Sequence, residues 1–376
     1  MELITCHRFH PVPHEVSPMR IANRQIGDSA PVYIIAELGV NHDGSVARAV
    51  ELVTSAAAAG ADAVKLQLFR TDLLMSRAAK LAVYQKSAGE SDPISMLRRL
   101  ELSIDQMAPL VRRAHELGMH AIVTVFSTEL VREAEQLPWD AYKTASPDII
   151  HKPLLDALAA TGRPLILSTG AAEIEEVARA VEWLAPHRDR LALLQCVSSY
   201  PTPAADASIG GMFALRELCP RVGYSDHTRE VDTGDLAADA GACILEKHFT
   251  YDKTAAGPDH AASLEPHEFK RYAELARDAS TLRIRIGSEG PIRLNDARLG
   301  PRQKRVLPCE KDVRLVSRQS ITTRIALKPG DTLRPEHLTV KRPGTGIPPW
   351  RLEEVINRKL SRPLEADTPI CDGDLG

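Results

Sequence analysis

The chain alternates short apolar runs with longer helical patterns, eight times over about 250 residues, and this alternation is the strongest constraint on its fold. Most of the runs are apolar nearly throughout, as expected of parallel strands covered on both faces. Several helical patterns stop at a glycine, a common helix end. Eight strand–helix units in this length predict an α/β fold of the (β/α)8 TIM-barrel type. The predicted strands are VYIIAELG (32–39), AVKLQLF (63–69), HAIVTVF (120–126), AYKTAS (141–146), PLILST (164–169), LALLQCVSSY (191–200), RVGYSD (221–226) and CILEKHF (243–249).

The barrel is expected to occupy residues 31–280, preceded by an N-terminal extension at 1–30. An open doubly wound sheet is the alternative, but no G-x-G-x-x-G follows the first strand. Residues 281–313 are charged, aperiodic and punctuated by Gly and Pro, which predicts a linker. Residues 314–376 hold short β-rich runs, turns at KPGD and RPGTG, and a helical PWRLEEVINR stretch. They are predicted to form a small separate domain that docks on another surface.

Composition excludes several functional classes. The chain of 376 residues has a formal net charge of −3 and only 4% aromatic residues, which argues against a nucleic-acid binder. Its six cysteines are scattered without a CxxC pair, as in a reduced cytoplasmic protein. The N-terminal stretch has no apolar signal region, and no run of 18 uncharged apolar residues occurs, so we expect neither secretion nor membrane insertion.

Polar side chains stand at the end of nearly every predicted strand, where the loops of a barrel form the active face. Such side chains cost free energy in an apolar strand unless they are paired or functional. The motifs GYSDHT and EKHFT place His227 and His248 at the ends of the last two strands. Two histidines on adjacent strands at this face favour a site for Mn²⁺, Zn²⁺ or Fe²⁺ over a pair of hydrogen-bonded structural histidines.

The ordered motifs of the chain resemble those of the sialic acid (N-acetylneuraminate) synthase family. The resemblance runs from about Pro31 to the C-terminus and rests on the motifs IIAELGVNHDGS, AVKLQLF, YKTAS, LILSTG, SSYPTP, GYSDHT, EKHFT with GPDHAASLEP, and VKRPGTGIPP. It implies the barrel fold followed by a C-terminal antifreeze-like (SAF) domain. It also implies a transferase that condenses phosphoenolpyruvate with an open-chain N-acylhexosamine and releases phosphate by C–O cleavage.

The resemblance assigns roles to individual residues. It implies that His227 and His248 hold a divalent metal ion, Mn²⁺, and are catalytic. Glu37, at the end of the first strand, is the candidate general base, either for the water that adds to phosphoenolpyruvate or for opening the sugar ring. The set assigned to phosphoenolpyruvate, cations and hydroxyls suited to an anion, is Lys65, Thr124, Lys143, Ser146, Ser168 and Ser225. The set assigned to the sugar is Gln67, Asp148, Tyr200, Asp259 and Arg342.

The family also uses its SAF domain to cap the site of the partner chain, which implies a domain-swapped homodimer with Arg342 reaching across. A planar guanidinium suits the binding of sugar oxygens, although Arg342 could instead only fix the RPGTG turn. The chain departs from the family pattern at Gln195, at Val125 and at Pro147-Asp148. These departures leave the aminosugar open among N-acetylmannosamine, its 6-phosphate and the diacetamido precursors of legionaminic or pseudaminic acid.

Other interpretations of the same residues remain open. Lys65 and Lys143 could pair with Glu37 and Asp148 in a structural network, or a strand lysine could form a Schiff base. The chain could act on an unaminated sugar phosphate to give a keto-deoxy sugar acid. It could also be a non-catalytic carbohydrate-binding protein on the same scaffold.

Overall fold

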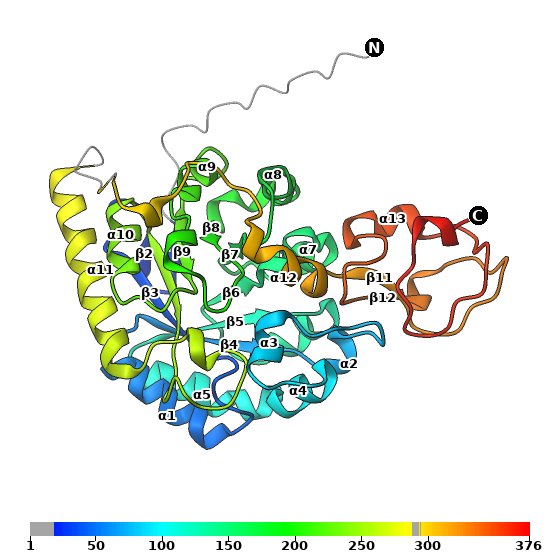
Figure 1. The fold of residues 1–376 in the computed structure, drawn as a ribbon, viewed down its shortest axis with the longest axis horizontal. Helices are drawn as coiled ribbons and strands as arrows, with labels where there is room; N and C mark the ends of the chain where they lie inside the picture. Colours follow the sequence, from blue (N-terminus) through cyan, green and yellow to red (C-terminus); the bar gives the residue numbers. More distant parts are fainter. Residues whose placement is uncertain (1–18, 288–292, 294) are drawn as a thin grey trace, which may run out of the picture.

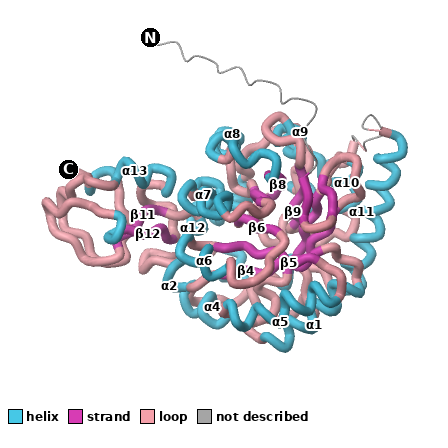
Figure 2. Tube along the Cα trace, turned by 180° about the vertical axis from the view of Figure 1, so that it is seen from behind, coloured by secondary structure: helices cyan, strands magenta, loops and turns pink. Residues whose placement is uncertain are grey.

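A closed barrel of eight parallel strands, surrounded by helices, forms the main body of the molecule (Figures 1 and 2). The computed structural model describes residues 19–287, 293 and 295–376. The strands are β3 (Tyr33–Glu37), β4 (Ala63–Leu68), β5 (His120–Val125), β6 (Ala141–Thr144), β7 (Leu165–Ser168), β8 (Leu191–Cys196), β9 (Val222–Asp226) and β10 (Ile244–His248). Each lies within one of the eight predicted runs, and β10 closes the barrel by pairing with β3. The predicted TIM barrel is confirmed, and the open sheet is excluded.

The helices around the barrel end where the sequence patterns predict. In α5, Ser103 Oγ accepts a hydrogen bond from Gln106 N, and the Gln106 side chain accepts one from Ser103 N, which forms a capping box. The helix is followed by Gly118, whose φ of +74° suits glycine. The barrel helices are α1 (Val46–Ala58), α5 (Ile104–Glu116), α6 (Val131–Ala134), α7 (Lys152–Ala160), α8 (Ile174–Trp183), α9 (Gly211–Arg216), α10 (Thr233–Asp239) and α11 (Pro266–Ile286).

Alternation along the strands separates the hydrophobic core from the interior of the barrel. In β4, Val64, Leu66 and Leu68 belong to the apolar layer beneath the helices. Lys65 and Gln67 alternate with them and therefore face the barrel axis. The connection from β4 to α5 is long and carries the short helices α2 (Thr71–Leu74), α3 (Val83–Ser87) and α4 (Pro93–Leu100). The same alternation brings polar side chains of the other strands to the barrel mouth.

A hairpin of β1 (Met19–Ile21) and β2 (Arg24–Ile26) precedes the barrel. Its buried Met19, Ile21 and Ile26 share one apolar cluster with residues near the beginnings of the barrel strands, so the hairpin covers that end of the barrel. The sequence predicted residues 1–30 only as an extension. Its first 18 residues lie outside the described part of the chain.

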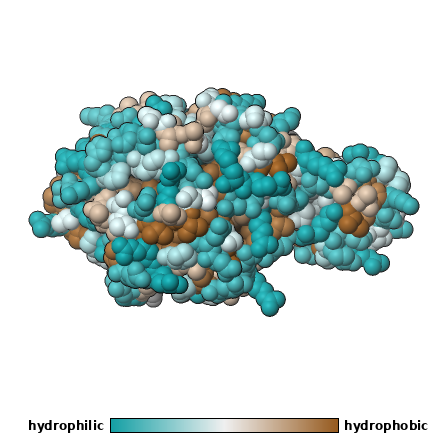
Figure 3. All heavy atoms as spheres, turned by 90° about the horizontal axis from the view of Figure 1, so that it is seen from below, coloured by the Kyte–Doolittle hydropathy of each residue, from teal (hydrophilic) through white to brown (hydrophobic). Residues whose placement is uncertain are grey.

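The C-terminal residues form a small lobe beside the barrel, visible in Figures 1 and 3. Its strands β11 (Ser320–Thr323) and β12 (Leu338–Lys341) are antiparallel, and α13 (Leu352–Val355) follows within the predicted helical stretch. The lobe has its own apolar core, to which Ile321, Leu338 and Ile370 contribute. Of the helices in the described part of the chain, none has the length and apolar composition needed to cross a bilayer.

The segment between the barrel and the small lobe is packed against the barrel over much of its length. After α11 ends at Ile286, the chain passes near α9 and leads into α12 (Lys311–Ser317), as Figure 1 shows in orange. Lys304 and Glu310 in this segment are 4% and 0% exposed. The sequence predicted a linker at 281–313, because the pattern there is charged and aperiodic. In the structure its last ten residues pack against the barrel like an additional βα loop.

Candidate active site

A cavity of about 140 Å³ lies at the carboxyl ends of the barrel strands. All but one of the residues that the sequence assigned to catalysis or substrate binding line this cavity; the exception is Asp148. The lining residues from that set are Glu37, Lys65, Gln67, Thr124, Lys143, Ser146, Ser168, Tyr200, Ser225, His227, His248, Asp259 and Arg342. The barrel thus brings together side chains that are as much as 305 positions apart in sequence (37 to 342). The roles assigned to them remain predictions.

The two histidines lie side by side at the ends of neighbouring strands. His227 directly follows β9 and His248 is the last residue of β10, with ring centroids 5.5 Å apart. Nδ1 of His227 lies 2.8 Å from the carbonyl oxygen of Val197. Because a carbonyl can only accept, this nitrogen carries a proton, which leaves Nε2 as the nitrogen available to coordinate a metal. Nδ1 of His248 is buried and has no hydrogen-bond partner among the described residues.

This pair fits a divalent metal ion. Burial, reinforced by the positive charges of His227 and Lys65, holds the pKa of His248 well below its usual value, so the imidazole is neutral and able to coordinate. No group of three or more His, Cys, Asp and Glu side chains in the described residues is arranged to hold a metal. A metal here would have two protein ligands, with the remaining positions open to water and substrate oxygens. An unbonded His248 nitrogen and a His227 oriented by a carbonyl suit that arrangement.

Two lysines and two glutamates form an ion-pair network at the floor of the cavity. Lys65 pairs with Glu37 and lies 3.7 Å from Glu246, while Lys143 lies 3.2 Å from Glu246. Burial lowers the pKa of Lys65 to about 7, although Glu246 opposes the shift. The alternative raised from the sequence paired Lys143 with Asp148, whereas the structure pairs it with Glu246. The geometry therefore leaves both a structural and a substrate-binding role for the lysines.

Hydroxyl groups gather on the opposite wall, at the ends of β6 and β7. Ser146 Oγ donates to Ser168 Oγ at 3.1 Å and accepts from the N–H of Gly170 at 2.9 Å. A Cβ at position 170 would clash with the side chains of Ser198 and Ser146, so the close approach of the turn requires glycine. Together with Lys143, these groups provide a cation and several donors for an anionic ligand.

Aromatic and acidic residues form the outer part of the cavity. Tyr200 stacks on His227, with ring centroids 4.1 Å apart, and on Tyr84 at 4.9 Å. Asp259 lies on the loop after β10, and burial raises its pKa to about 6. Gln67 Nε2 donates to the carbonyl of Gly39 at 2.9 Å. These groups offer stacking surfaces, donors and acceptors, which are the features needed to bind a sugar.

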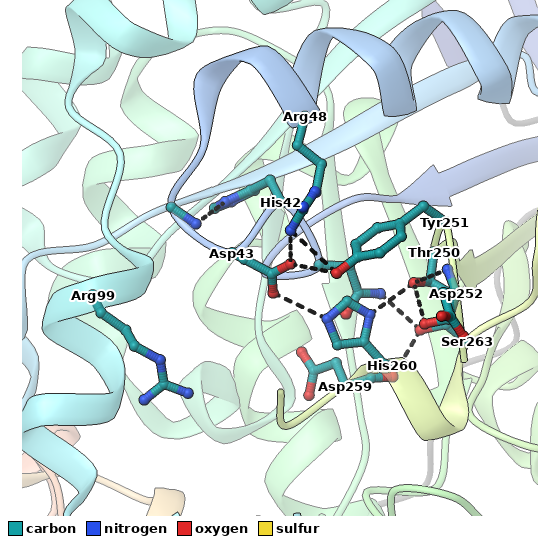
Figure 4. A network of polar contacts seen from close by, with 12 residues as sticks. His42, Asp43, Arg48, Arg99, Thr250, Tyr251, Asp252, Asp259, His260 and Ser263 are labelled. Atoms are coloured by element: carbon teal, nitrogen blue, oxygen red, sulfur yellow. Dashed lines mark hydrogen bonds and ion pairs between the residues drawn. The ribbon is translucent and has the colours of Figure 1, made fainter. Parts of the chain in front are cut away.

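The loop that carries Asp259 is held by residues that follow β3 (Figure 4). Nε2 of the buried His260 lies 3.0 Å from Asp43 Oδ1. Asn41 Nδ2 donates to Ser263 Oγ at 2.8 Å, and Ser263 Oγ donates in turn to the carbonyl of Asp259 at 2.7 Å. The position of the Asp259 carboxyl group is therefore set by contacts between two loops that are neighbours on the barrel.

Arg342 reaches the cavity from the small lobe of the same chain. Its backbone N–H donates to Leu74 O at 2.9 Å, and its carbonyl accepts from Ser76 N at 3.0 Å. The guanidinium carbon lies 5.7 Å from the centre of the Phe126 ring. In this single chain the small lobe therefore covers its own barrel mouth, and no second chain is needed to bring Arg342 to the cavity.

Comparison with known proteins identifies the family. A family model described as the NeuB family matches residues 52–287, which is more than half of the chain. The chain belongs to the NeuB family. The SAF domain model matches residues 318–376, the small lobe described above. The resemblance seen in the sequence motifs is thus confirmed, both for the barrel and for its C-terminal domain.

Relatives of this NeuB-family chain match along nearly their whole length. The N,N'-diacetyllegionaminic acid synthase of Legionella pneumophila is 37% identical over 92% of this chain and 94% of its own. The N-acetylneuraminate-9-phosphate synthase of Homo sapiens is 30% identical over 93% and 94%. The crystal structure of the spore coat polysaccharide biosynthesis protein SpsE of Bacillus subtilis superposes with a TM-score of 0.80 at 29% identity, covering 96% of this chain and 99% of that one.

Two of the three departures from the NeuB-family pattern lie outside the cavity. Val125 is buried in the layer between strands and helices. Gln195 donates to the carbonyl of Ser208 at 3.0 Å and packs against Gly211, on the outer side of β8. Pro147 does line the cavity. Of the departures, only the one at Pro147-Asp148 can therefore alter substrate binding directly.

Tyr84 and Glu246 are among the residues of the cavity that were not assigned to the site from the sequence. Tyr84 comes from α3, whose short polar pattern resembles that of any surface helix. Glu246 lies two positions before His248 on β10, so alternation places both on the inner face. That period of two was the signal that could have placed Glu246 beside the lysines. No comparable signal exists for Tyr84, because its position depends on the path of a long connection.

Asp148 gives a prediction about pH. It is fully buried, neither carboxyl oxygen has a hydrogen-bond partner in the described residues, and burial raises its pKa to about 7. The unfolded chain releases this proton near pH 4, so the stability that the group contributes is full below that pH and is lost as the pH rises to 7. Between pH 5 and 8 the melting temperature of the wild type should fall by roughly 5 °C more than that of Asp148→Asn.

Differential scanning calorimetry across this pH range measures the effect, and Asp105→Asn is the matched control, since Asp105 is exposed at the start of α5. Parallel pH profiles for the wild type and Asp148→Asn would contradict the prediction.

Proposed function

We propose that the chain is a nonulosonate synthase that condenses phosphoenolpyruvate with an open-chain N-acylated hexosamine. The observation that supports this most strongly is the cavity itself, which combines two neighbouring imidazoles, two buried lysines and a group of serine hydroxyls. Relatives across the NeuB family are named as synthases of legionaminic, neuraminic and pseudaminic acids. The names of these relatives give no corresponding support to an unaminated sugar phosphate or to a purely binding role.

The proposal divides the cavity into two halves. Lys65 and Lys143 supply positive charge for the carboxylate and phosphate of phosphoenolpyruvate, and Ser146 and Ser168 supply hydroxyl donors at the phosphate end. Ser225, whose hydroxyl donates to Glu246 at 2.9 Å, and Thr124, which accepts from Lys65 at 3.2 Å, keep these charged groups oriented.

The sugar half lies toward the SAF domain. Gln67, Tyr200, Asp259 and Arg342 line it, and Asp148 lies immediately behind Pro147. Mn²⁺ held by His227 and His248 would polarise the aldehyde oxygen of the sugar as a Lewis acid.

The proposed condensation has three reactants: phosphoenolpyruvate, the sugar and one water molecule. C3 of phosphoenolpyruvate bonds to the aldehyde carbon, whose oxygen takes up a proton; water adds to C2, and the C–O bond to phosphate breaks. Glu37 takes the proton of that water. Its carboxylate is fixed in place by the N–H of Gly39, at 2.8 Å, and by Lys65.

Phosphate release tests the proposal directly. The purified chain is incubated with phosphoenolpyruvate, Mn²⁺ and a panel that contains N-acetylmannosamine, its 6-phosphate and 2,4-diacetamido hexoses. Release that depends on an aminosugar supports the proposed function and identifies the substrate. Release only with tetrose or pentose phosphates would make the chain a keto-deoxy sugar acid synthase. Sugar binding without any release would make it a carbohydrate-binding protein.

Arg342→Ala should raise the KM for the sugar at least about tenfold and change the KM for phosphoenolpyruvate little, because a lost charge-assisted hydrogen bond is worth roughly 1.5–3 kcal/mol. Steady-state kinetics with each substrate varied in turn measures the two KM values separately. Arg334→Ala is the control, since Arg334 lies exposed on the same domain. Equal changes in both KM values would limit Arg342 to fixing the RPGTG turn.

We also propose the domain-swapped homodimer, in which the same contacts of Arg342 would form between two chains. Mixing Arg342→Ala with His248→Ala subunits distinguishes the two arrangements. In a swapped dimer, one of the two sites has both residues intact and partial activity returns. No recovery in demonstrably mixed dimers would overturn the swap and leave the arrangement within one chain.

A further inference from the structure

The segment from Lys304 to Ser317 lies between the two family models, which end at 287 and begin at 318. It is nevertheless built into the active-site end of the barrel. Val313 and Ser317 of α12 line the cavity. The buried Lys304 donates to the carbonyl of Cys196, at the end of β8, at 3.4 Å. A segment with these contacts contributes part of the wall of the site.

Glu310 is the centre of this attachment. It is 0% exposed, and its Oε1 accepts the backbone N–H of Ala171 at 2.6 Å and that of Ser198 at 2.7 Å. Its Oε2 accepts the N–H of Leu307 at 2.8 Å. One carboxylate thus joins the turn after β7, the end of β8 and its own segment. Hydrogen bonds to a buried charge are among the stronger ones in proteins.

Ala171 is held from both sides. Its φ is +49°, a left-handed conformation that is unfavourable for a residue with a Cβ. While Glu310 binds its N–H, its carbonyl accepts from Arg314 and, at 2.9 Å, from Arg318. Both arginines also pair with Glu176. We call this set of contacts the Glu310 clamp; its charged residues are the carboxylates Glu310 and Glu176 and the cations Lys304, Arg314 and Arg318. Because the cations outnumber the carboxylates, the clamp adds no net negative charge beside an anion site.

The turn held in this way adjoins the two serines of the phosphate half. Ser168 ends β7, and Gly170, next to Ala171, donates its N–H to Ser146 Oγ. Ser198, whose N–H also binds Glu310, lines the cavity. Loss of the Glu310 carboxylate would free both backbone segments and leave the strained Ala171 without its N–H contact.

We propose that Glu310 is a positioning residue for the phosphoryl end of the cavity, holding Ser168, Gly170 and Ser198 in the arrangement that binds phosphoenolpyruvate. Because the chain passes from Glu310 through α12 directly into the SAF domain, the same clamp connects the cap to the phosphate half. The inference rests on the proposed function and assigns a substrate-specific role to a segment that belongs to neither family model.

Glu310→Ala should raise both the KM and the calorimetric Kd for phosphoenolpyruvate about tenfold, and leave the KM for the sugar within about twofold. Glu310→Gln can keep both N–H bonds through its Oε1 and should recover most of the affinity. Glu175→Ala is the matched control, because it removes an exposed carboxylate from the neighbouring helix α8. If Glu310→Ala does not fold, Arg314→Met carries the test: it keeps the Glu310 contacts and the Arg318 donor, and removes only the Arg314 contacts to the carbonyl of Ala171 and to Glu176.

A merely structural role would lower the melting temperature of Glu310→Ala while its Kd for phosphoenolpyruvate stayed at the wild-type value. That result, or an equal loss of sugar and phosphoenolpyruvate affinity, would overturn the proposal without affecting the proposed function. A wild-type chain that bound no phosphoenolpyruvate would refute the proposed function, and the role of Glu310 with it.

Discussion

His248→Ala should lose Mn²⁺ binding and at least roughly a thousandfold in turnover, because Lewis-acid polarisation of a carbonyl is worth several kcal/mol. The loss is expected to be large because His227 alone would remain of the pair, and the described residues contain no group of three metal-binding side chains that could take over the ion. Chelation should likewise stop the wild-type enzyme, and added Mn²⁺ should restore it.

Electron paramagnetic resonance of free Mn²⁺ measures binding without relying on activity. His267→Ala is the control, since the side chain of His267 is 77% exposed on α11. His248→Gln preserves much of the side-chain volume and shows whether the fold survives the loss of the imidazole. Mn²⁺ binding and turnover by His248→Ala at wild-type levels would show that the metal site lies elsewhere.

The barrel could be predicted because its signal is local and repeated. Each strand is an apolar run bounded by polar or glycine residues, so an error in the exact ends of one run would not have changed the number of predicted strands. The position of His227 and His248 followed directly, because the ends of parallel strands share one face of a barrel. Thirteen of the fourteen assigned residues lie in one cavity, all except Asp148, although Asp259 and Arg342 were assigned from the family resemblance rather than from strand ends.

The parts that could not be predicted depend on contacts between distant segments. Two of the partners of Glu310 are backbone N–H groups 139 and 112 positions away. Every residue except proline has a backbone N–H, so the sequence does not indicate which of them Glu310 binds. The sequence around Glu310 is charged and has no helical or strand periodicity, and it was therefore predicted to be a linker. The β1–β2 hairpin is likewise too short to have a recognisable pattern, and its apolar residues become informative only when the end of the barrel is present to bury them.

Lys143 shows how a network seen without substrate can be interpreted in two ways. Lys143 is 3% exposed, and its ammonium nitrogen lies 3.2 Å from Glu246, which also lies 3.7 Å from Lys65 and accepts a hydrogen bond from the hydroxyl of Ser225. The alternative raised from the sequence paired Lys143 with Asp148, but closure of the barrel between β3 and β10 brings Glu246 to the lysines instead. Burying such a pair contributes little net stability, but removing one partner leaves the other charge uncompensated.

Lys143→Met is therefore expected to weaken phosphoenolpyruvate binding by about tenfold to a hundredfold, since it deletes a cation that faces a trianionic substrate. It should also destabilise the fold, because Glu246 loses one of its two cations. The double variant Lys143→Met/Glu246→Gln separates these effects. Removing the uncompensated carboxylate should return the melting temperature toward that of the wild type, whereas the affinity for phosphoenolpyruvate, measured by calorimetry, should stay low.

The two interpretations of Lys143 diverge in this double variant. If the lysine only neutralises Glu246, both the melting temperature and the dissociation constant should return together, because nothing that contacts substrate has been lost. If the lysine binds phosphoenolpyruvate, stability returns without affinity, since a methionine cannot attract a phosphate or a carboxylate. Recovery of wild-type affinity in Lys143→Met/Glu246→Gln would assign Lys143 to the structural network and leave Lys65 as the cation of the phosphoenolpyruvate half.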